Sequence, residues 1–355
     1  MQKKIDLRSD TVSLPTSEMI EAITKAKLGD DVLQEDSTVI QLEKEAAMRL
    51  GKEAALLVPS GTFGNQAAVY THTNQGDEVI LADRSHIVQH EVGAASVISG
   101  VQLRTIHSDD GMITAKAIEE LIRKEENIHY PKTGLIALQN PLGNGRVVPL
   151  NIFEEIKELA NHYGIPVHLD GARIFNAATY LKTDVKNISA IADSVMFCLS
   201  KGLGAPVGSI LTGSKAFIKN ARKTRKLMGG GMRQAGIIAA PGIYALNVMT
   251  QRLEEDHDNI RRLAKALQNY ELFDIDFSNI HTNILYIGFH SENKNTGHYF
   301  TEILNDYGIL CYPPYYGQTR FVAHHNVSSG DIDYIINLLP EITVKLRNRI
   351  ENPRE

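Results

Sequence analysis

The sequence predicts an α/β protein in which a mainly parallel sheet is flanked by helices and followed by a smaller α+β domain. From about Ser17 onwards, helical periodicity alternates with short apolar runs that end at Gly, Pro, Asp or Asn, which is typical of βα units. Beyond about residue 250 this alternation stops, and short strand patterns precede a long final helix. A chain of 355 residues is long enough for one large or two medium domains with a sizeable core.

Five buried-strand patterns follow one another in the larger domain, at residues 54–58, 78–81, 134–138, 165–169 and 194–199. The last two end at Asp170-Gly171 and at Ser200-Lys201-Gly202, so each places polar residues at the carboxyl end of a strand. Open α/β sheets bind their ligands at this edge. The sequence therefore predicts a ligand site at the ends of these two strands.

The domain boundary is expected inside a long helix over 244–269, because the second half of this segment becomes strongly polar. Beyond it, a helix that begins near Ser328 carries one apolar face. Three strand patterns precede that helix, at residues 283–287, 309–311 and 319–322. We therefore expect three parts: an N-terminal segment over 1–15, a large domain over 16–250 and a small α+β domain over 251–355.

Charge and composition favour a small-molecule partner. With 37 Lys and Arg against 42 Asp and Glu the net charge is −5, so no overall positive field attracts nucleic acid or an anionic membrane. No apolar run reaches the roughly 18 to 20 residues that span a bilayer, and no secretory signal is visible. The two cysteines, Cys198 and Cys311, are expected to be buried thiols of a cytoplasmic protein. Residues 215–233 hold seven Lys and Arg and no acid, which we interpret as a solvated helix face.

Lys201 is the sharpest chemical signal, because it comes directly after a near-continuous apolar run and before a glycine-rich loop. An ammonium group without a partner is costly to bury, and burial favours the neutral amine that attacks a carbonyl carbon to form a Schiff base. The alternative interpretation is a lysine that reaches from the end of a strand into solvent.

Asp170 ends another inner strand, 31 residues before Lys201, which is about one helix-plus-strand unit. The two residues are therefore expected to be neighbours across the sheet. A carboxylate that faces a pyridinium nitrogen keeps it protonated, which is the electron sink of pyridoxal phosphate. Taken alone, Asp170 is as well explained by a helix cap or a turn. His168 lies on the same strand, but no third ligand follows at the spacing of a metal site, so no metal is expected.

The segment Ser60-Gly61-Thr62-Phe63-Gly64-Asn65 follows a strand and opens a helix. Its small residues and the Thr62 hydroxyl leave backbone N–H groups able to form an anion cup. The segment matches neither the Walker pattern nor the dinucleotide fingerprint, so a tight strand-to-helix turn without a ligand is the alternative.

Together these motifs resemble the threonine aldolases, which are pyridoxal-phosphate enzymes of the aspartate-aminotransferase fold. The resemblance extends over most of the first 270 residues and includes Ile5 to Val12, Gly29 to Val32, the anion cup, Arg84 to Ile87, Asp170 to Arg173, the lysine motif and Gly229 to Gln234. It implies a seven-stranded sheet in a large cofactor-binding domain, with the N-terminal segment near the active site. It also implies cleavage of L-threonine or L-allo-threonine to glycine and acetaldehyde.

The resemblance implies a role for each matching residue. Lys201 bonds to the cofactor, Asp170 holds the pyridinium and His86 stacks on the ring. Two groups complete the set: Gly61, Thr62 and Arg233 at the phosphate, and Ser9, Arg173 and Arg320 at the substrate carboxylate, with Arg173 also close to the cofactor. Taken singly, each arginine is as readily a surface or ion-pair residue, and His86 a hydrogen-bonded histidine at a strand end. Because Arg233 is expected to reach a phosphate across a subunit interface, we expect at least a homodimer, or a homotetramer.

Two departures from the family pattern bear on the substrate. Where the family has a histidine, this chain has Leu142 in the segment 139–146, and Leu33 replaces a tyrosine. The base for the β-hydroxyl is therefore left open between His86, His90 and a water molecule. The rival functions are β-elimination, racemisation or transamination with the same cofactor, or a cofactor-binding protein without turnover.

Overall fold

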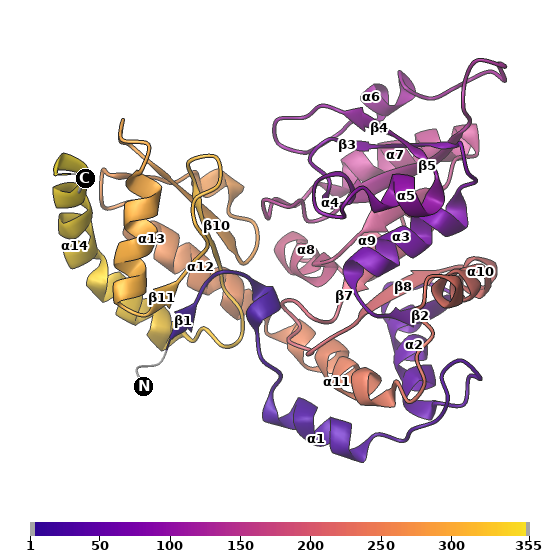
Figure 1. Cartoon of the computed structure of the whole chain (residues 1–355), viewed down its shortest axis with the longest axis horizontal. Helices are drawn as coiled ribbons and strands as arrows, with labels where there is room; N and C mark the ends of the chain where they lie inside the picture. The colour runs from indigo at the N-terminus through magenta and orange to yellow at the C-terminus, as the bar shows by residue number, and fades with distance from the viewer. Residues whose placement is uncertain (1–3, 353–355) are drawn as a thin grey trace. The chain divides into compact units, whose positions relative to one another are not determined.

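The computed structural model describes residues 4–352 and divides them into two compact units (Figure 1). The larger unit comprises residues 15–143 and 147–250. The smaller unit comprises the described residues up to Leu14, residues 144–146 and the chain from Gln251 onwards. The N-terminal segment, which the sequence predicts to be a separate part, is grouped by its contacts with the C-terminal unit.

The larger unit is built on a seven-stranded sheet, which confirms the predicted α/β class. Its strands are β2 (Ala54–Val58), β3 (Glu78–Ala82), β4 (Gln102–Ile106), β5 (Thr133–Gln139), β6 (Val167–Asp170), β7 (Ser194–Cys198) and β8 (Ser209–Gly213). They lie in the order β2-β8-β7-β6-β5-β3-β4, and only β8 runs antiparallel to its two neighbours. Every residue of β7 is buried, as expected for a strand that is covered on both faces.

Helices surround this sheet. They are α1 (Ser17–Lys25), α2 (Ser37–Leu50), α3 (Gly61–His72), α4 (His86–Gln89), α5 (Ala94–Ser99), α6 (Ala115–Glu119), α7 (Leu150–Tyr163), α8 (Ile174–Leu181), α9 (Val185–Ser189), α10 (Lys215–Leu227) and α11 (Gly236–Asn247). In Figure 1, α3 packs beside α5 and α10, while α2 contacts α9 and α11. Side chains cap the N-termini of α1, α2, α3 and α10. Thr16, Asp36, Ser60 and Ser214 each accept a hydrogen bond from a backbone N–H of the first turn.

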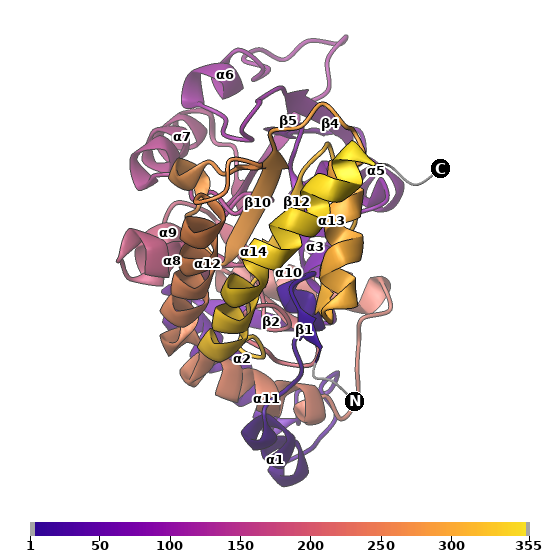
Figure 2. The same ribbon diagram turned by 90° about the vertical axis from the view of Figure 1, so that its left-hand side faces the viewer.

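The smaller unit combines short strands with three longer helices. The strands are β1 (Ile5–Asp6), β9 (Phe273–Asp274), β10 (Ile284–Phe289), β11 (Ile309–Leu310) and β12 (Thr319–Val322), and the short 3₁₀ turns are Asp10–Val12 and Phe277–Asn279. The helices are α12 (Leu253–Leu267), α13 (Thr296–Asp306) and α14 (Ser329–Glu351). β10 pairs with both β9 and β12, β1 pairs with β11, and the three helices lie over the β10–β12 sheet (Figure 2). Phe300 and Phe321 lie fully inside its apolar core.

Residues 144–146 belong to the smaller unit because Gly145 lies against β10. Thr282 donates a hydrogen bond from Oγ1 to the Gly145 carbonyl at 3.0 Å. A Cβ at position 145 would meet the Ile284 Cβ at 2.8 Å, and φ is +88°. Both the close approach and the left-handed backbone therefore require glycine here.

The single helix expected over 244–269 is wrong, because the structure breaks it. α11 ends at Asn247, a 3₁₀ turn spans Met249–Gln251, and α12 begins at Leu253. The two helices serve different cores: Leu253, Ile260 and Leu263 are buried in the smaller unit, whereas α11 packs against α1 and α2. No glycine or proline marks the break, because it reflects the change of unit rather than a helix-breaking residue.

Cys198 and Cys311 are both free and buried, as predicted. Burial raises the pKa of the Cys311 thiol to about 11, so this group is an inert part of the core. Within residues 4–352, no helix is both long and apolar enough to cross a membrane.

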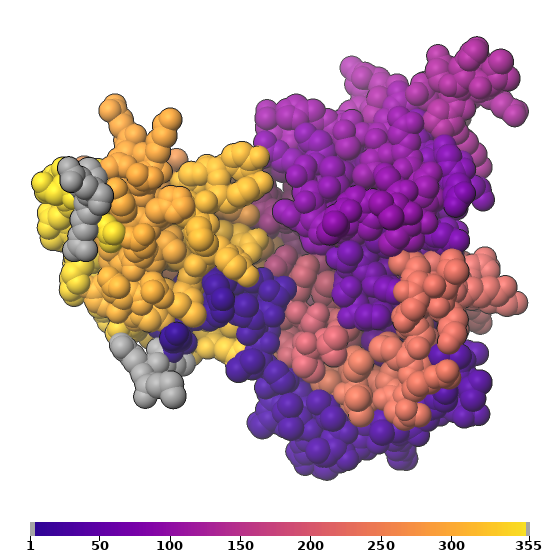
Figure 3. Space-filling view, viewed as in Figure 1, coloured from indigo at the N-terminus to yellow at the C-terminus, as the bar shows by residue number. Residues whose placement is uncertain are grey.

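The basic cluster over 215–233 is only partly a solvated face. Its helix, α10, lies in the salmon-coloured surface segment of Figure 3 and exposes Lys219. Arg225, on the same helix, has a side chain only 2% exposed, and it donates to the Asp31 carboxylate at 2.6 Å and the Leu57 carbonyl at 2.7 Å. This buried ion pair ties α10 to the loop after α1 and to β2.

We expect Arg225→Ala to lower the free energy of unfolding by about 3 to 5 kcal/mol, because the change leaves the buried Asp31 carboxylate with only the longer ion pair to Arg222, at 3.8 Å. Urea titration followed by circular dichroism measures this loss. The matched control is Lys219→Ala, which removes an exposed cation from the same helix and should change stability by less than about 0.5 kcal/mol. Equal stability of the two variants would contradict the assignment of Arg225 as a structural residue.

Candidate functional site

Two neighbouring strands of the larger unit bring Asp170 and Lys201 to one edge of the sheet. β6 and β7 run parallel, with Asp170 opposite Met196, and Lys201 follows the end of β7 by three residues. Asp170 is 3% exposed; its Oδ1 accepts the Ala172 N–H at 3.0 Å and its Oδ2 accepts the Asn65 side-chain amide at 2.9 Å. The predicted arrangement of these residues at adjacent strand ends is therefore what the topology produces.

The N-terminus of α3 lies against the end of β7. Ser60 caps the helix by accepting the Phe63 N–H at 3.1 Å. A Cβ on Gly61 would lie 2.8 Å from the Cys198 Sγ, and a Cβ on Gly64 would lie 2.6 Å from the Met196 Cγ. The glycines thus let the helix start approach the strand that leads to Lys201. The first N–H groups of a helix have no partner within it, so Gly61 and Thr62 present donors suited to an anion.

His86, the first residue of α4, comes close to Asp170. Its backbone N–H donates to the Gln139 Oε1 at 3.0 Å, and its ring Nδ1 lies 2.7 Å from the Glu91 Oε1. One ligand atom from each of His86, Glu91 and Asp170 lies within 4.8 Å of the others. Its neighbour His90 is exposed, with the two ring centroids 5.5 Å apart.

A buried polar network that sequence reasoning missed surrounds Asp170. The Asn65 side chain is fully buried; its Nδ2 donates both to Asp170 and to Glu91, at 2.9 and 2.8 Å. Its Oδ1 lies 3.1 Å from the His168 Nε2. Complete burial lowers the pKa of His168 to about 3, so this ring is neutral at ordinary pH. Gln66 also donates to Glu91, at 2.5 Å.

The trio His86, Glu91 and Asp170 has the donor types of a metal site, but its hydrogen bonds favour another use. Asn65 directs its amide hydrogens at both carboxylates, and Gln66 and Ala172 add further N–H donors. Because these donors already occupy the carboxylate oxygens, the group is better described as a hydrogen-bonded polar cluster than as a cation cage.

The structure places the remaining predicted residues of the larger unit as follows. Arg173 stands at the start of α8, three residues after Asp170 and at the same edge of the sheet. Arg233 pairs with the Asp30 carboxylate at 2.8 Å, and its side chain is 58% exposed. The loop before it packs on the cup segment, since a Cβ on Gly230 would lie 2.5 Å from the Phe63 ring.

Ser9 and Arg320 both belong to the smaller unit, where their segments lie side by side. Arg320 donates to the Arg8 carbonyl at 3.2 Å, and its guanidinium lies 6.0 Å from the Tyr312 ring centroid. The Ser9 Oγ accepts from the Thr11 N–H at 3.2 Å. Their part in a common substrate site with the larger unit stays a prediction.

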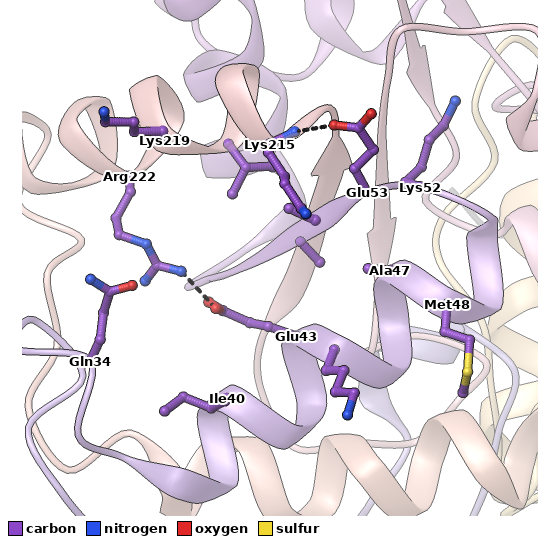
Figure 4. A pocket seen from close by; sticks show the side chains of 14 residues that line it. Gln34, Ile40, Glu43, Ala47, Met48, Lys52, Glu53, Lys215, Lys219 and Arg222 are labelled. Carbon is purple, nitrogen blue, oxygen red and sulfur yellow. Dashed lines mark hydrogen bonds and ion pairs between the residues drawn. The ribbon is translucent and has the colours of Figure 1, made fainter.

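A groove of about 570 Å³ elsewhere on the larger unit contains none of the predicted site residues (Figure 4). It lies between α2, β2 and α10, and Glu43 and Arg222 point toward each other across it, 2.6 Å apart. This ion pair offsets the charge of a buried carboxylate. The side chains that could take part in a reaction lie in the strand-end cluster around Asp170 and not in this groove.

Comparison with known proteins identifies relatives over nearly the whole chain. The sequence model of the family described as beta-eliminating lyase matches residues 6–289. Low-specificity L-threonine aldolase 1 of Arabidopsis thaliana is 39% identical over 352 residues, covering 98% of each chain. The low specificity L-threonine aldolase of Escherichia coli K12 is 42% identical over 290 residues, covering 81% of this chain and 86% of that protein.

Solved structures share the fold at low sequence identity. A threonine aldolase of Leishmania major matches with a TM-score of 0.81 at 18% identity, covering 95% of this chain and 99% of that chain. A serine palmitoyltransferase of Sphingomonas wittichii matches with a TM-score of 0.75 at 15% identity, covering 97% and 88%. These two likenesses concern the fold alone.

Proposed function

Because this chain belongs to the beta-eliminating lyase family, we propose that it is a pyridoxal-phosphate-dependent aldolase that cleaves L-threonine and L-allo-threonine to glycine and acetaldehyde. The observation that carries the proposal is the placement of Asp170 and Lys201 at adjacent strand ends, beside the N-terminus of α3. The names of relatives with 39% and 42% identity support the same activity.

The residues at this edge fit the cofactor. The buried Asp170 carboxylate can accept a hydrogen bond from a pyridinium N–H and so keep that nitrogen protonated, and the Lys201 amine can bond to an aldehyde carbon. The first N–H groups of α3 and the Thr62 hydroxyl can hold a phosphate, and Arg233 of a second copy is proposed to add a cation. Pyridoxal phosphate, when bound, supplies a ring that accepts the electron pair of a bond to the substrate Cα.

The chain's own side chains would then select which bond breaks. Arg173, Arg320 and Ser9 are proposed to hold the substrate carboxylate, since a guanidinium can bind a carboxylate through two parallel hydrogen bonds. Fixing the carboxylate orients the Cα–Cβ bond for cleavage. Leu142, in place of the family histidine, is a buried hydrocarbon side chain, so it offers no base. We assign the removal of the β-hydroxyl proton to the ring nitrogen Nε2 of His86.

Product analysis of the purified protein with added pyridoxal phosphate tests this function. We expect glycine and acetaldehyde in equal amounts from both L-threonine and L-allo-threonine. Ammonia with 2-oxobutyrate would indicate β-elimination. Inversion at Cα, giving D-allo-threonine from L-threonine or D-threonine from L-allo-threonine, would indicate racemisation, and no product at all would favour a binding protein. Any of these three results in place of acetaldehyde would overturn the proposal.

We also propose that the protein acts in the cytoplasm as a homodimer or homotetramer. Helix α11 packs on both α1 and α2. These helices and the loop between α1 and α2 leave large apolar side chains exposed: Ile20, Leu28, Leu33, Ile40 and Ile237, with Leu28 and Leu33 in the loop. Exposed apolar surface of this kind favours association. A second copy is the proposed occupant, with Arg233 reaching its cofactor phosphate. A monomer in sedimentation that still holds the cofactor would contradict this proposal.

We expect Arg173→Ala and Arg320→Ala each to raise the KM for threonine by roughly 10- to 100-fold, because a charge-assisted hydrogen bond to the carboxylate is lost. The visible spectrum of the bound cofactor should change little. Steady-state kinetics measures the effect, and Arg262→Ala, at a partly exposed arginine of the smaller unit, is the control. An unchanged KM in both variants would place the carboxylate elsewhere.

A further inference from the structure

Glu91 is a buried carboxylate in an otherwise exposed segment. Its side chain is 0% exposed, although His90 and Val92 on either side are exposed, Val92 at 97%. Within the described residues, Glu91 forms an ion pair with His86. A buried carboxylate needs donors, and this one receives three, from His86, Asn65 and Gln66. The Glu91 side chain therefore points inward, where hydrogen-bond donors compensate the burial of its charge.

The backbone beside Glu91 adds an independent observation. Val92 has φ +56°, a left-handed conformation that a β-branched residue rarely adopts. The Val92 side chain is almost fully exposed, so its own packing cannot hold the backbone in this state. The strained residue directly follows the buried Glu91, and backbone strain of this kind gathers at functional sites.

The hydrogen bonds determine which nitrogen of His86 carries its proton. Asn65 and Gln66 both donate to the Glu91 carboxylate, which fits its ionised form, and an ionised carboxylate only accepts. The Nδ1 of His86, 2.7 Å from Glu91, must therefore carry a hydrogen and donate it. In the neutral ring the lone pair then lies on Nε2, the atom available to take a proton.

The same network connects His86 with Asp170. One amide group of Asn65 donates to both Glu91 and Asp170, and the Oδ1 of Asn65 is held by His168. His168 bonds in turn to the Ser194 hydroxyl at 2.9 Å. Each member has its polar atoms directed by the next, so Asn65 cannot rotate without losing several bonds.

From this geometry we propose that Glu91 is a positioning residue that orients the His86 imidazole so that its Nε2 carries the lone pair. Asn65 fixes the positions of the Glu91 and Asp170 carboxylates relative to each other. The inference rests on the proposed function, because it gives His86 its proton-accepting atom. Glu91 itself acts through His86, as a carboxylate behind a histidine does at metal and hydrolase sites.

The first test uses turnover. We expect Glu91→Gln to lower kcat for threonine about 10- to 100-fold, with KM changed less than about threefold and the acidic limb of the pH profile moved to lower pH. In the His86→Asn background, adding Glu91→Gln should cost no further activity, because the residue acts through the ring. A loss of equal size in both backgrounds would overturn the proposal. Glu271→Gln, at an exposed glutamate, is the control for the substitution.

The second test needs no turnover. Diethyl pyrocarbonate acylates neutral imidazole nitrogens, and mass spectrometry of the cofactor-stripped full chain measures its rate at His86 against pH. We expect the Glu91→Gln variant to acylate His86 at lower pH than wild type, with the exposed His107, paired with Asp83, unchanged as an internal control. Identical pH dependence at His86 in both proteins would refute the inference.

Two further outcomes are separated by design. If Glu91→Gln fails to fold, Glu91→Asp keeps the charge but withdraws it by one methylene from Nδ1, and it should also lower kcat; wild-type kcat in a folded Glu91→Asp protein would count against the proposal. If wild type releases no acetaldehyde, the proposed function fails, whereas the labelling of His86 still decides whether Glu91 controls the ring.

Discussion

The Lys201→Ala protein is expected to be colourless and to cleave threonine at less than about one-thousandth of the wild-type rate. The visible colour of the bound cofactor depends on its bond to a lysine amine, and Lys201 supplies the amine at the end of β7. Alanine removes the amine but leaves β7, whose five residues are buried through their own packing. The absorbance spectrum after incubation with pyridoxal phosphate, and acetaldehyde release, measure the two effects.

The control for Lys201→Ala is Lys219→Ala, which removes an exposed amine from the same unit. It should stay yellow and fully active. Circular dichroism and the midpoint of thermal unfolding establish that both variants are folded. A yellow, active Lys201→Ala protein would show that a different amine carries the chemistry, and the site at the ends of β6 and β7 would be abandoned.

The strand ends could be predicted from the sequence because their signals are local. An apolar run that ends at Asp170-Gly171 or near Lys201-Gly202 predicts both the strand and the polar group at its carboxyl end. The neighbouring placement of β6 and β7 follows from the preference of βα units for adjacent parallel strands. The start of α3 could be predicted in the same way, since Ser60 and the glycines after it are contiguous, and its use as an anion cup stays a prediction.

The missing parts have no local signal. Asn65 and Gln66 lie on α3, whereas Glu91 lies in the segment between α4 and α5, and the packing of α3 beside α5 makes them partners of Asp170 and His86. Their types alone are common in solvated helices. The burial of Arg225 could not be predicted for a similar reason, because the six other cations of its cluster indicated a solvent-exposed helix face. The edge strand β4 was not predicted from the sequence, because none of its five residues is fully buried and several are polar.

Asp170→Asn is expected to lower turnover of threonine by about 10²- to 10³-fold while part of the cofactor binding survives. A neutral amide no longer stabilises a proton on the ring nitrogen, so the ring accepts electrons from the substrate less well. The structure adds a second cost. The Oδ2 of Asp170 accepts from the Asn65 amide at 2.9 Å, and an asparagine that keeps the Ala172 bond would turn its own NH₂ group toward that donor.

Two donors facing each other inside the protein cannot both be satisfied, so Asp170→Asn also disturbs the hold of Asn65 on Glu91. The loss of turnover should therefore exceed what a change of ring charge alone would cause. Kinetics and cofactor titration of Asp170→Asn, with Asp306→Asn at an exposed site as control, measure the loss. Near wild-type turnover in Asp170→Asn would remove this carboxylate from the cofactor, and the buried network around it would then be structural only.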